Sequence, residues 1–214
     1  MQDYPRLGYI PIPTYSRRPK PATSEDGFFA QTLSSPITIP TVTTYKLRDL
    51  QSPLPSQLPS WPSPTAPPAP IPLPGADLVM VLQLASPGVC GHPDTAHGGV
   101  LATVIDEAMS LGVTLYAPEA GEGHAQTGSS KSTGRNKADG HDTAGGRIRS
   151  KMFTSQLDVR YKQPVKVPGS IEVRVAVLAK SGRKVWVRAQ VVQGGEIMVD
   201  AAAFWLLTSP KSVI

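Results

Sequence analysis

The residues best suited to chemistry lie in one stretch of the sequence, from Ala96 to Gly112, which reads AHGGVLATVIDEAMSLG. An acidic pair, Asp106 and Glu107, interrupts this otherwise apolar run. A carboxylate in apolar surroundings costs stability unless it is paired or used in a reaction. Two glycines follow His97 where a helix would begin, and the free backbone N–H groups of a helix start can bind a negatively charged oxygen. An acid combined with such an anion site indicates attack on a carbonyl group.

The spacing of these groups indicates a site shared between subunits. His97 and Asp106 are nine residues apart, which in one helix corresponds to about 13 Å of rise and roughly half a turn. They cannot easily meet around one carbonyl group within a single chain. The geometry is satisfied when the Gly98 amide of one subunit faces Asp106 of another. The sequence therefore predicts an oligomer with composite sites, and the strand expected to pair across its two-fold axis is Phe153–Gln163.

The sequence gives little support to metal or disulfide chemistry. Cys90, His92, Asp94 and His97 lie close together along the chain, but their spacing matches no standard zinc motif. We therefore expect no metal and no cofactor. Cys90 is the single cysteine of the sequence, which excludes an intrachain disulfide and fits a reducing compartment.

The proline content divides the chain into two parts. Of the 23 prolines, 17 lie in residues 1–75. We expect an extended proline-rich N-terminal arm there, with a short helix near residues 24–33 and a linker of polyproline II character over Gln51–Gly75. Residues 76–208 are the predicted folded domain. Within it, residues 118–150 are predicted to be a flexible glycine-rich insertion, and residues 209–214 form a C-terminal tail.

Hydrophobic periodicity predicts the elements of that domain. Asp77–Leu84 is an apolar strand, Ser86–Ala96 is a loop, and Gly98–Tyr116 is a long helix that is apolar, and so expected to be buried, on nearly all sides. Four further strands are predicted from alternating apolar residues and glycine turns: Phe153–Gln163, Ser170–Lys180, Lys184–Val192 and Glu196–Thr208. This order predicts an α+β fold in which a curved antiparallel sheet wraps around a long central helix.

Three features within Ala76–Thr208 carry a resemblance to a known family. They are His97-Gly98-Gly99 followed by Asp106, Thr154 at the start of the next strand, and Tyr161-Lys162-Gln163-Pro164 at the end of that strand. With this order of elements, the domain resembles the hotdog-fold thioesterases, in particular the phenylacetate-pathway and mitochondrial acyl-CoA thioesterase-like branch. One position departs from the family pattern. Many relatives carry Asn or a similar polar residue six positions before the histidine, where this chain has Gly91.

The resemblance implies a role for each matching residue. Asp106 would activate water or attack the thioester carbonyl directly, and the Gly98 amide would polarise the carbonyl oxygen. Thr154 would orient the acid or the water, and His97 would line the site or position the loop. The candidate substrate-binding residues are Gly99, His92, Lys162 and Arg160. Two interpretations are open for Lys162 and Arg160: they contact the phosphates of coenzyme A, or they are ordinary surface charges.

The resulting functional expectation is an acyl-CoA thioesterase that hydrolyses a fatty or aromatic acyl-CoA. A thioesterase acting on acyl-carrier-protein or polyketide substrates and a non-catalytic acyl-binding hotdog module are the alternatives. The expected assembly is a homodimer or a dimer of dimers. The net charge of +5, without a dense basic tract, gives no indication of nucleic acid binding. No apolar run approaches the ~18 residues of a membrane span. We expect an intracellular protein, with a cytoplasmic location favoured and a mitochondrial location as the alternative.

Overall fold

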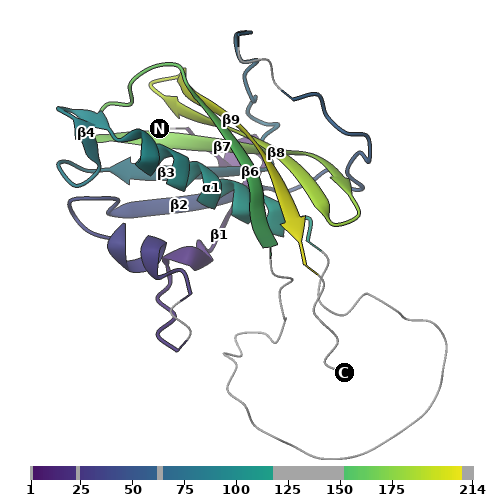
Figure 1. Cartoon of the computed structure of the whole chain (residues 1–214), viewed down its shortest axis with the longest axis horizontal. Coiled ribbons are helices and arrows are strands. Elements are labelled where there is room, and N and C mark those ends of the chain that lie inside the picture. The colour runs from purple at the N-terminus through teal and green to yellow at the C-terminus, as the bar shows by residue number, and fades with distance from the viewer. Residues whose placement is uncertain (1, 23–24, 62–64, 118–151, 209–214) are drawn as a thin grey trace, which may run out of the picture.

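One long helix and a seven-stranded antiparallel sheet form the body of the protein (Figure 1). The structure is a computed structural model that describes residues 2–22, 25–61, 65–117 and 152–208. The strands lie in the order β1-β2-β3-β7-β8-β9-β6, and a separate two-stranded sheet pairs β4 with β5. The elements in chain order are η1 (Pro5–Leu7), β1 (Tyr9–Ile12), η2 (Tyr15–Arg17), η3 (Phe28–Thr32), β2 (Thr41–Leu47), β3 (Leu78–Leu84), β4 (Cys90–His92), β5 (Thr95–Ala96), α1 (Gly98–Thr114), β6 (Met152–Tyr161), β7 (Gly169–Ser181), β8 (Lys184–Gln193) and β9 (Glu196–Leu207).

Helix α1 packs one face against the sheet. Leu101, Val104, Ile105, Ala108 and Met109 are buried on that face, as their spacing of three and four residues requires. The prediction that this helix is buried on nearly all sides is wrong, because its opposite face is only half-buried. That face carries the chemically interesting residues: Ala102, Thr103, Asp106, Glu107 and Ser110 are of intermediate exposure.

The four strands predicted after the helix are present as β6 to β9. Alternate residues of β7, β8 and β9 are buried toward the helix, including Val173, Val187 and Ala201. The turns occur where glycines allow a positive φ, at Gly182 and at the pair Gly194-Gly195. Strand β6 pairs with β9 on one side and ends the sheet. The predicted α+β arrangement of one main helix and one large antiparallel sheet is confirmed.

The N-terminal part of the chain contributes two strands that the sequence analysis did not anticipate. Strand β2 pairs with β3 over six residue pairs, and β1 pairs with β2. Tyr4, Tyr9 and Tyr45 pack together there, with ring centroids 4.6 Å apart for Tyr4 and Tyr45. Together with Ile71 and Val79 they build a second apolar cluster, separate from the one that contains helix α1. The sheet therefore extends into the region expected to be an arm.

A buried ionic network holds part of the proline-rich segment on the sheet. The Asp200 carboxylate is fully buried, and the guanidinium groups of Arg160 and Arg188 and the side-chain amide of Gln190 donate hydrogen bonds to it. Arg188 and Gln190 also donate to the carbonyl oxygen of Ala69, at 2.6 and 2.9 Å. This part of the predicted linker is therefore fixed to the sheet.

Other expectations differ in detail. The short helix near residues 24–33 is one helical turn, η3, whose Phe29 is buried while Phe28 is 58% exposed. Arg17 ties this segment together by donating to the carbonyl oxygens of Phe29, Leu33 and Ile39. The predicted loop before the helix contains the small hairpin β4–β5. The predicted insertion 118–150 and tail 209–214 lie outside the described residues.

Candidate active site

The helix acid and the strand hydroxyl predicted to work together are in contact. Thr154 on β6 donates a hydrogen bond from Oγ1 to Oδ1 of Asp106 on α1, at 2.8 Å. The two residues are 48 positions apart in the sequence, so this contact exists only because β6 lies beside the helix. The Asp106 carboxylate thus has one oxygen fixed by the threonine.

Burial and hydrogen bonding act in opposite directions on the Asp106 carboxyl group. Partial removal from water raises its pKa, and the hydrogen bond from Thr154 lowers it. The net effect is a pKa above the ordinary value of 3.8. A carboxylate with a raised pKa is a stronger base and a better nucleophile than an ordinary aspartate, as long as it remains ionised.

The start of helix α1 presents one free amide. His97 is the N-cap residue, and its Nδ1 accepts a hydrogen bond from the Gly99 N–H at 2.9 Å. This contact occupies the Gly99 amide, which leaves that group unsuited to bind a carbonyl oxygen. In the described part of the chain no acceptor contacts the Gly98 N–H. The Gly98 amide is therefore the group that the helix start offers to a negatively charged oxygen.

Tyr161 covers the same helix start, a role that the sequence analysis did not assign. Its hydroxyl group donates to the carbonyl oxygen of Gly98 at 2.7 Å. A Cβ atom at position 98 would lie 3.3 Å from Cζ and from the hydroxyl oxygen of this tyrosine, so the contact favours glycine. The only sequence signal was the position of Tyr161 at the end of the strand that carries Thr154.

Asp106 and Gly98 do not meet within one chain. Both lie on the continuous helix α1, and eight residues of helix separate their backbones by about 12 Å along the axis. The structure therefore places the acid and its hydroxyl partner together, and the amide at the far end of the same helix.

Position 91, where the family pattern has a polar residue, is crowded by the histidine. A Cβ atom on Gly91 would lie 3.0 Å from Cα and 3.2 Å from Cβ of His97. These distances are shorter than about nine in ten real contacts of a Cβ atom, so a side chain at this position would require the N-cap residue to shift by a few tenths of an ångström. The close approach of His97 explains why this position holds a glycine.

The remaining predicted substrate-binding residues occupy separate places. Lys162 follows β6 and is exposed, whereas Arg160 pairs with the buried Asp200, and its side chain is only 11% exposed. Arg160 is thus part of the network that holds the sheet and the proline-rich segment. His92 lies exposed on β4. In the described ranges no three His, Cys, Asp or Glu side chains gather as metal ligands, and no helix is long and apolar enough to cross a membrane.

Glu107, the second residue of the acidic pair, faces the N-terminal segment. Burial, the largest influence, raises the pKa of its carboxyl group above the ordinary value, and the nearby Asp26 and Asp106 add to this rise. Ser16 and Lys20 lower the pKa but do not reverse the shift. Glu107 is therefore a partly buried acid next to the candidate catalytic acid, and it faces the N-terminal segment whereas Asp106 faces Thr154.

Comparison with known proteins assigns the family. A sequence model of the thioesterase superfamily matches residues 94–199, which include α1 and β6. No curated protein sequence is detectably similar to the chain.

Similar solved structures include a Bacillus halodurans protein determined with CoA, at 18% identity and a TM-score of 0.44. The match covers 60% of this chain and 66% of that one, just under two thirds of its length. A hypothetical thioesterase from Streptococcus pneumoniae, determined with coenzyme A, has 15% identity, a TM-score of 0.43 and coverages of 63% and 83%. A mutant of the phenylacetic acid degradation protein PaaI from Thermus thermophilus has 16% identity, a TM-score of 0.43 and coverages of 62% and 84%.

The segment that matches the superfamily contains His97, Asp106 and Thr154, and the elements around them have the hotdog arrangement of one long helix against an antiparallel sheet. The segment of residues 94–199 is a match to the thioesterase superfamily. The resemblance found in the sequence is thereby confirmed at the level of the superfamily.

Proposed function

We propose that this protein hydrolyses acyl-CoA thioesters, with a fatty or aromatic acyl group. The observation that carries the proposal is the hydrogen bond of 2.8 Å between Thr154 and Asp106, which joins the helix acid to a hydroxyl group from the neighbouring strand. A structural aspartate could also form this bond. However, the carboxyl group has a raised pKa and lies on the half-buried face of the helix, where a substrate can reach it.

In the proposed reaction, Asp106 begins as the carboxylate. It either removes a proton from water, which then attacks the thioester carbon, or attacks that carbon itself to give a mixed anhydride that water hydrolyses. The C–S bond breaks in both routes, the acyl group leaves as the free acid, and the sulfur takes a proton to leave as the thiol of coenzyme A. The Gly98 N–H stabilises the negative charge on the carbonyl oxygen, a contribution that is typically worth about 3–4 kcal/mol of the barrier.

The amide and the acid are supplied by two subunits in this proposal. Strand β6 is paired only on its β9 side within the described residues, so its other edge can pair with β6 of a second copy. Phe153 and Tyr161 on this strand are 57% and 51% exposed and would be covered by the partner. A two-fold axis at this edge gives two equivalent sites, each with Gly98 from one subunit and Asp106 and Thr154 from the other.

The direct test is the variant Asp106→Asn, assayed by release of free thiol from a panel of acyl-CoA substrates. We expect loss of turnover by a factor of about 100 or more, because the amide is neither a base nor a nucleophile. Circular dichroism and thermal unfolding serve as the control for an intact fold. Full activity of this variant would rule out the mechanism, and an inactive wild-type protein that still binds the acyl-CoA would favour a binding module.

The shared site has a test of its own. Asp106→Asn and Gly98→Ala are each expected to be inactive, but a mixed dimer contains one site with an intact amide from one subunit and an intact acid from the other. Mixing the two variants under conditions that exchange subunits should therefore restore activity. If both required groups came from one chain, the mixture would stay inactive.

A further inference from the structure

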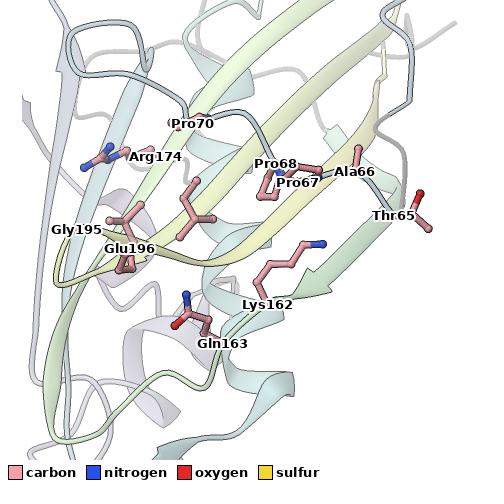
Figure 2. A pocket seen from close by; sticks show the side chains of 12 residues that line it. Thr65, Ala66, Pro67, Pro68, Pro70, Lys162, Gln163, Arg174, Gly195 and Glu196 are labelled. Carbon is pink, nitrogen blue, oxygen red and sulfur yellow. The ribbon is translucent and has the colours of Figure 1, made fainter.

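An open cleft lies beside the end of β6, where Lys162 lines it. It is bounded by the proline-rich segment and by the turn that joins β8 to β9 (Figure 2). It has a volume of about 530 Å³, which lies within the range of small-molecule sites in proteins. Pro67 and Pro68 form one wall, and Lys162 and Glu196 form the opposite side. The cleft therefore combines an apolar wall with two groups of opposite charge. Residues 65–70, which build the wall, lie outside the segment that matches the superfamily.

Hydrogen bonds hold both sides of the cleft in place. On one side, the Ile71 N–H donates to Oε1 of Gln190 at 2.8 Å, and the carbonyl oxygen of Ala69 accepts from Arg188 and Gln190. On the other side, the backbone N–H groups of Lys162 and Gln163 both donate to the carbonyl oxygen of Met198, at 2.8 and 3.1 Å. The cleft is therefore preorganised, and a ligand that enters it does not have to order the proline-rich segment.

The charged groups of the cleft are available to a ligand. Among the residues that the structure describes, none pairs with the Lys162 ammonium group or the Glu196 carboxylate. Arg174 at the far end is already engaged by Glu172, at 2.9 Å. A ligand that satisfies this arrangement has an anionic group for the lysine, a hydrogen-bond donor for the glutamate and a flat apolar surface for the prolines. An adenine nucleotide has all three, because its exocyclic amino group is a donor.

The cleft lies next to the candidate active site. Lys162 directly follows Tyr161, whose hydroxyl group is 2.7 Å from the carbonyl oxygen of Gly98. Tyr161 contacts the helix start and Lys162 lines the cleft, so the end of β6 lies between the two. A substrate whose carbonyl group binds at Gly98 and whose long flexible arm passes the end of β6 would place its distal part here.

We propose that the cleft binds the adenosine 3′-phosphate 5′-diphosphate end of coenzyme A, with the purine against Pro67 and Pro68 and a phosphate on Lys162. The proposal rests on the proposed function, since it specifies where the carrier half of the same substrate is held. The proline-rich segment then has a role in substrate binding. It also distinguishes coenzyme A from an acyl carrier protein, whose prosthetic group lacks the adenosine.

The test compares two substrates with the same acyl group, the acyl-CoA and the acyl N-acetylcysteamine thioester, which has no nucleotide. We expect Lys162→Ala to raise KM for the acyl-CoA about fivefold, the upper value for an exposed ion pair, without a change for the short thioester. Lys162→Arg should retain most of the affinity. Pro67→Trp, which fills the cleft, should raise KM for the acyl-CoA only.

Two variants serve as matched controls. Lys184→Ala removes the same charge at the start of β8, far along the strand from the cleft, and Pro55→Trp places the same bulk on an exposed proline outside it. Both should leave the two KM values unchanged. Equal effects of Lys162→Ala on both substrates, or no effect on either, would overturn the proposal.

Failure of the proposed function gives a different result. If the wild-type protein hydrolyses neither thioester, calorimetry with free coenzyme A still tests the cleft. Binding that weakens about fivefold in Lys162→Ala and in Pro67→Trp supports the cleft without the activity. Binding that is the same in the wild type and both variants excludes it, as does an absence of binding to the wild type.

Discussion

Thr154 Oγ1 and Asp106 Oδ1 are 2.8 Å apart, and this hydrogen bond joins the edge strand of the sheet to the half-buried face of the only long helix in the described chain. It fixes the direction of the carboxylate and reduces the rise in pKa that burial causes. The acid is thereby oriented and kept ionised over a wider range of pH.

The first prediction concerns this hydrogen bond. Thr154→Val removes the donor while keeping the shape of the side chain, so the pKa of Asp106 should rise further. Activity that needs the carboxylate is present above that pKa, and the acidic limb of the profile of kcat/KM against pH should therefore move to higher pH. We expect kcat to fall about tenfold. Thr154→Ser should restore both values, and an unchanged acidic limb in Thr154→Val would contradict this role.

The second prediction concerns the glycine that departs from the family pattern. Gly91→Asn introduces the polar residue of many relatives, but its Cβ atom would lie 3.0 Å from Cα of His97. We expect the displaced N-cap to lower kcat and the melting temperature. Gly91→Ala should have a similar effect, because the cause is steric. Faster turnover in Gly91→Asn than in the wild type would show that the amide is accommodated.

The third prediction concerns Glu107 and the pH dependence of stability. Burial raises the pKa of this carboxyl group in the folded state. A group with a raised folded-state pKa contributes its stability in full below the unfolded-state pKa and loses it as the pH rises through the folded-state value. Glu107→Gln removes this loss. Its melting temperature should exceed that of the wild type by a few degrees at pH 7 to 8 and approach it near pH 4. A lower melting temperature at pH 8 would contradict this account.

The fourth prediction concerns the buried acid of β9. Asp200→Ala leaves Arg160 and Arg188 without their shared carboxylate, and removal of one partner from a buried ionic group typically costs about 3–5 kcal/mol. Urea denaturation should show a loss of this size. The matched variant Asp158→Ala removes an acid that accepts one hydrogen bond, from Trp61, and it should cost less than about 1 kcal/mol. Equal losses would show that the network is not a principal support of the fold.

The sequence predicted those parts of the fold that local patterns determine. The glycines and the three- and four-residue spacing of apolar side chains located helix α1. Alternation located β7 and β8, and the turn at Gly194-Gly195 located β9. Strand β1 was missed because it has four residues and contains Pro11, and β2 was missed because only one of its seven residues is buried. Strand β2 is stabilised by pairing with β3, and β1 by pairing with β2. Both also contribute to a cluster that includes Ile71, so these contacts join residues far apart in the chain.

The same distinction applies to the site. Asp106, Gly98 and Thr154 were predicted from residue type and spacing, and the structure brings two of them into contact. The engagement of the Gly99 amide by His97 and the contact of Tyr161 with Gly98 depend on side-chain directions that a one-dimensional pattern does not contain. Only one weak feature of the sequence indicated that Asp200 is buried: it precedes three alanines within a predicted strand.

The two edges of the sheet have different capacities for growth. Strand β1 is four residues long and includes Pro11, which has no N–H group to donate to a further strand, whereas β6 has ten residues. A sheet that can add a copy at both edges can continue into a fibre. In the proposed dimer the β6 edges are joined, and Pro11 disfavours the addition of a further strand at β1, so the N-terminal strands would limit edge-to-edge association to a pair.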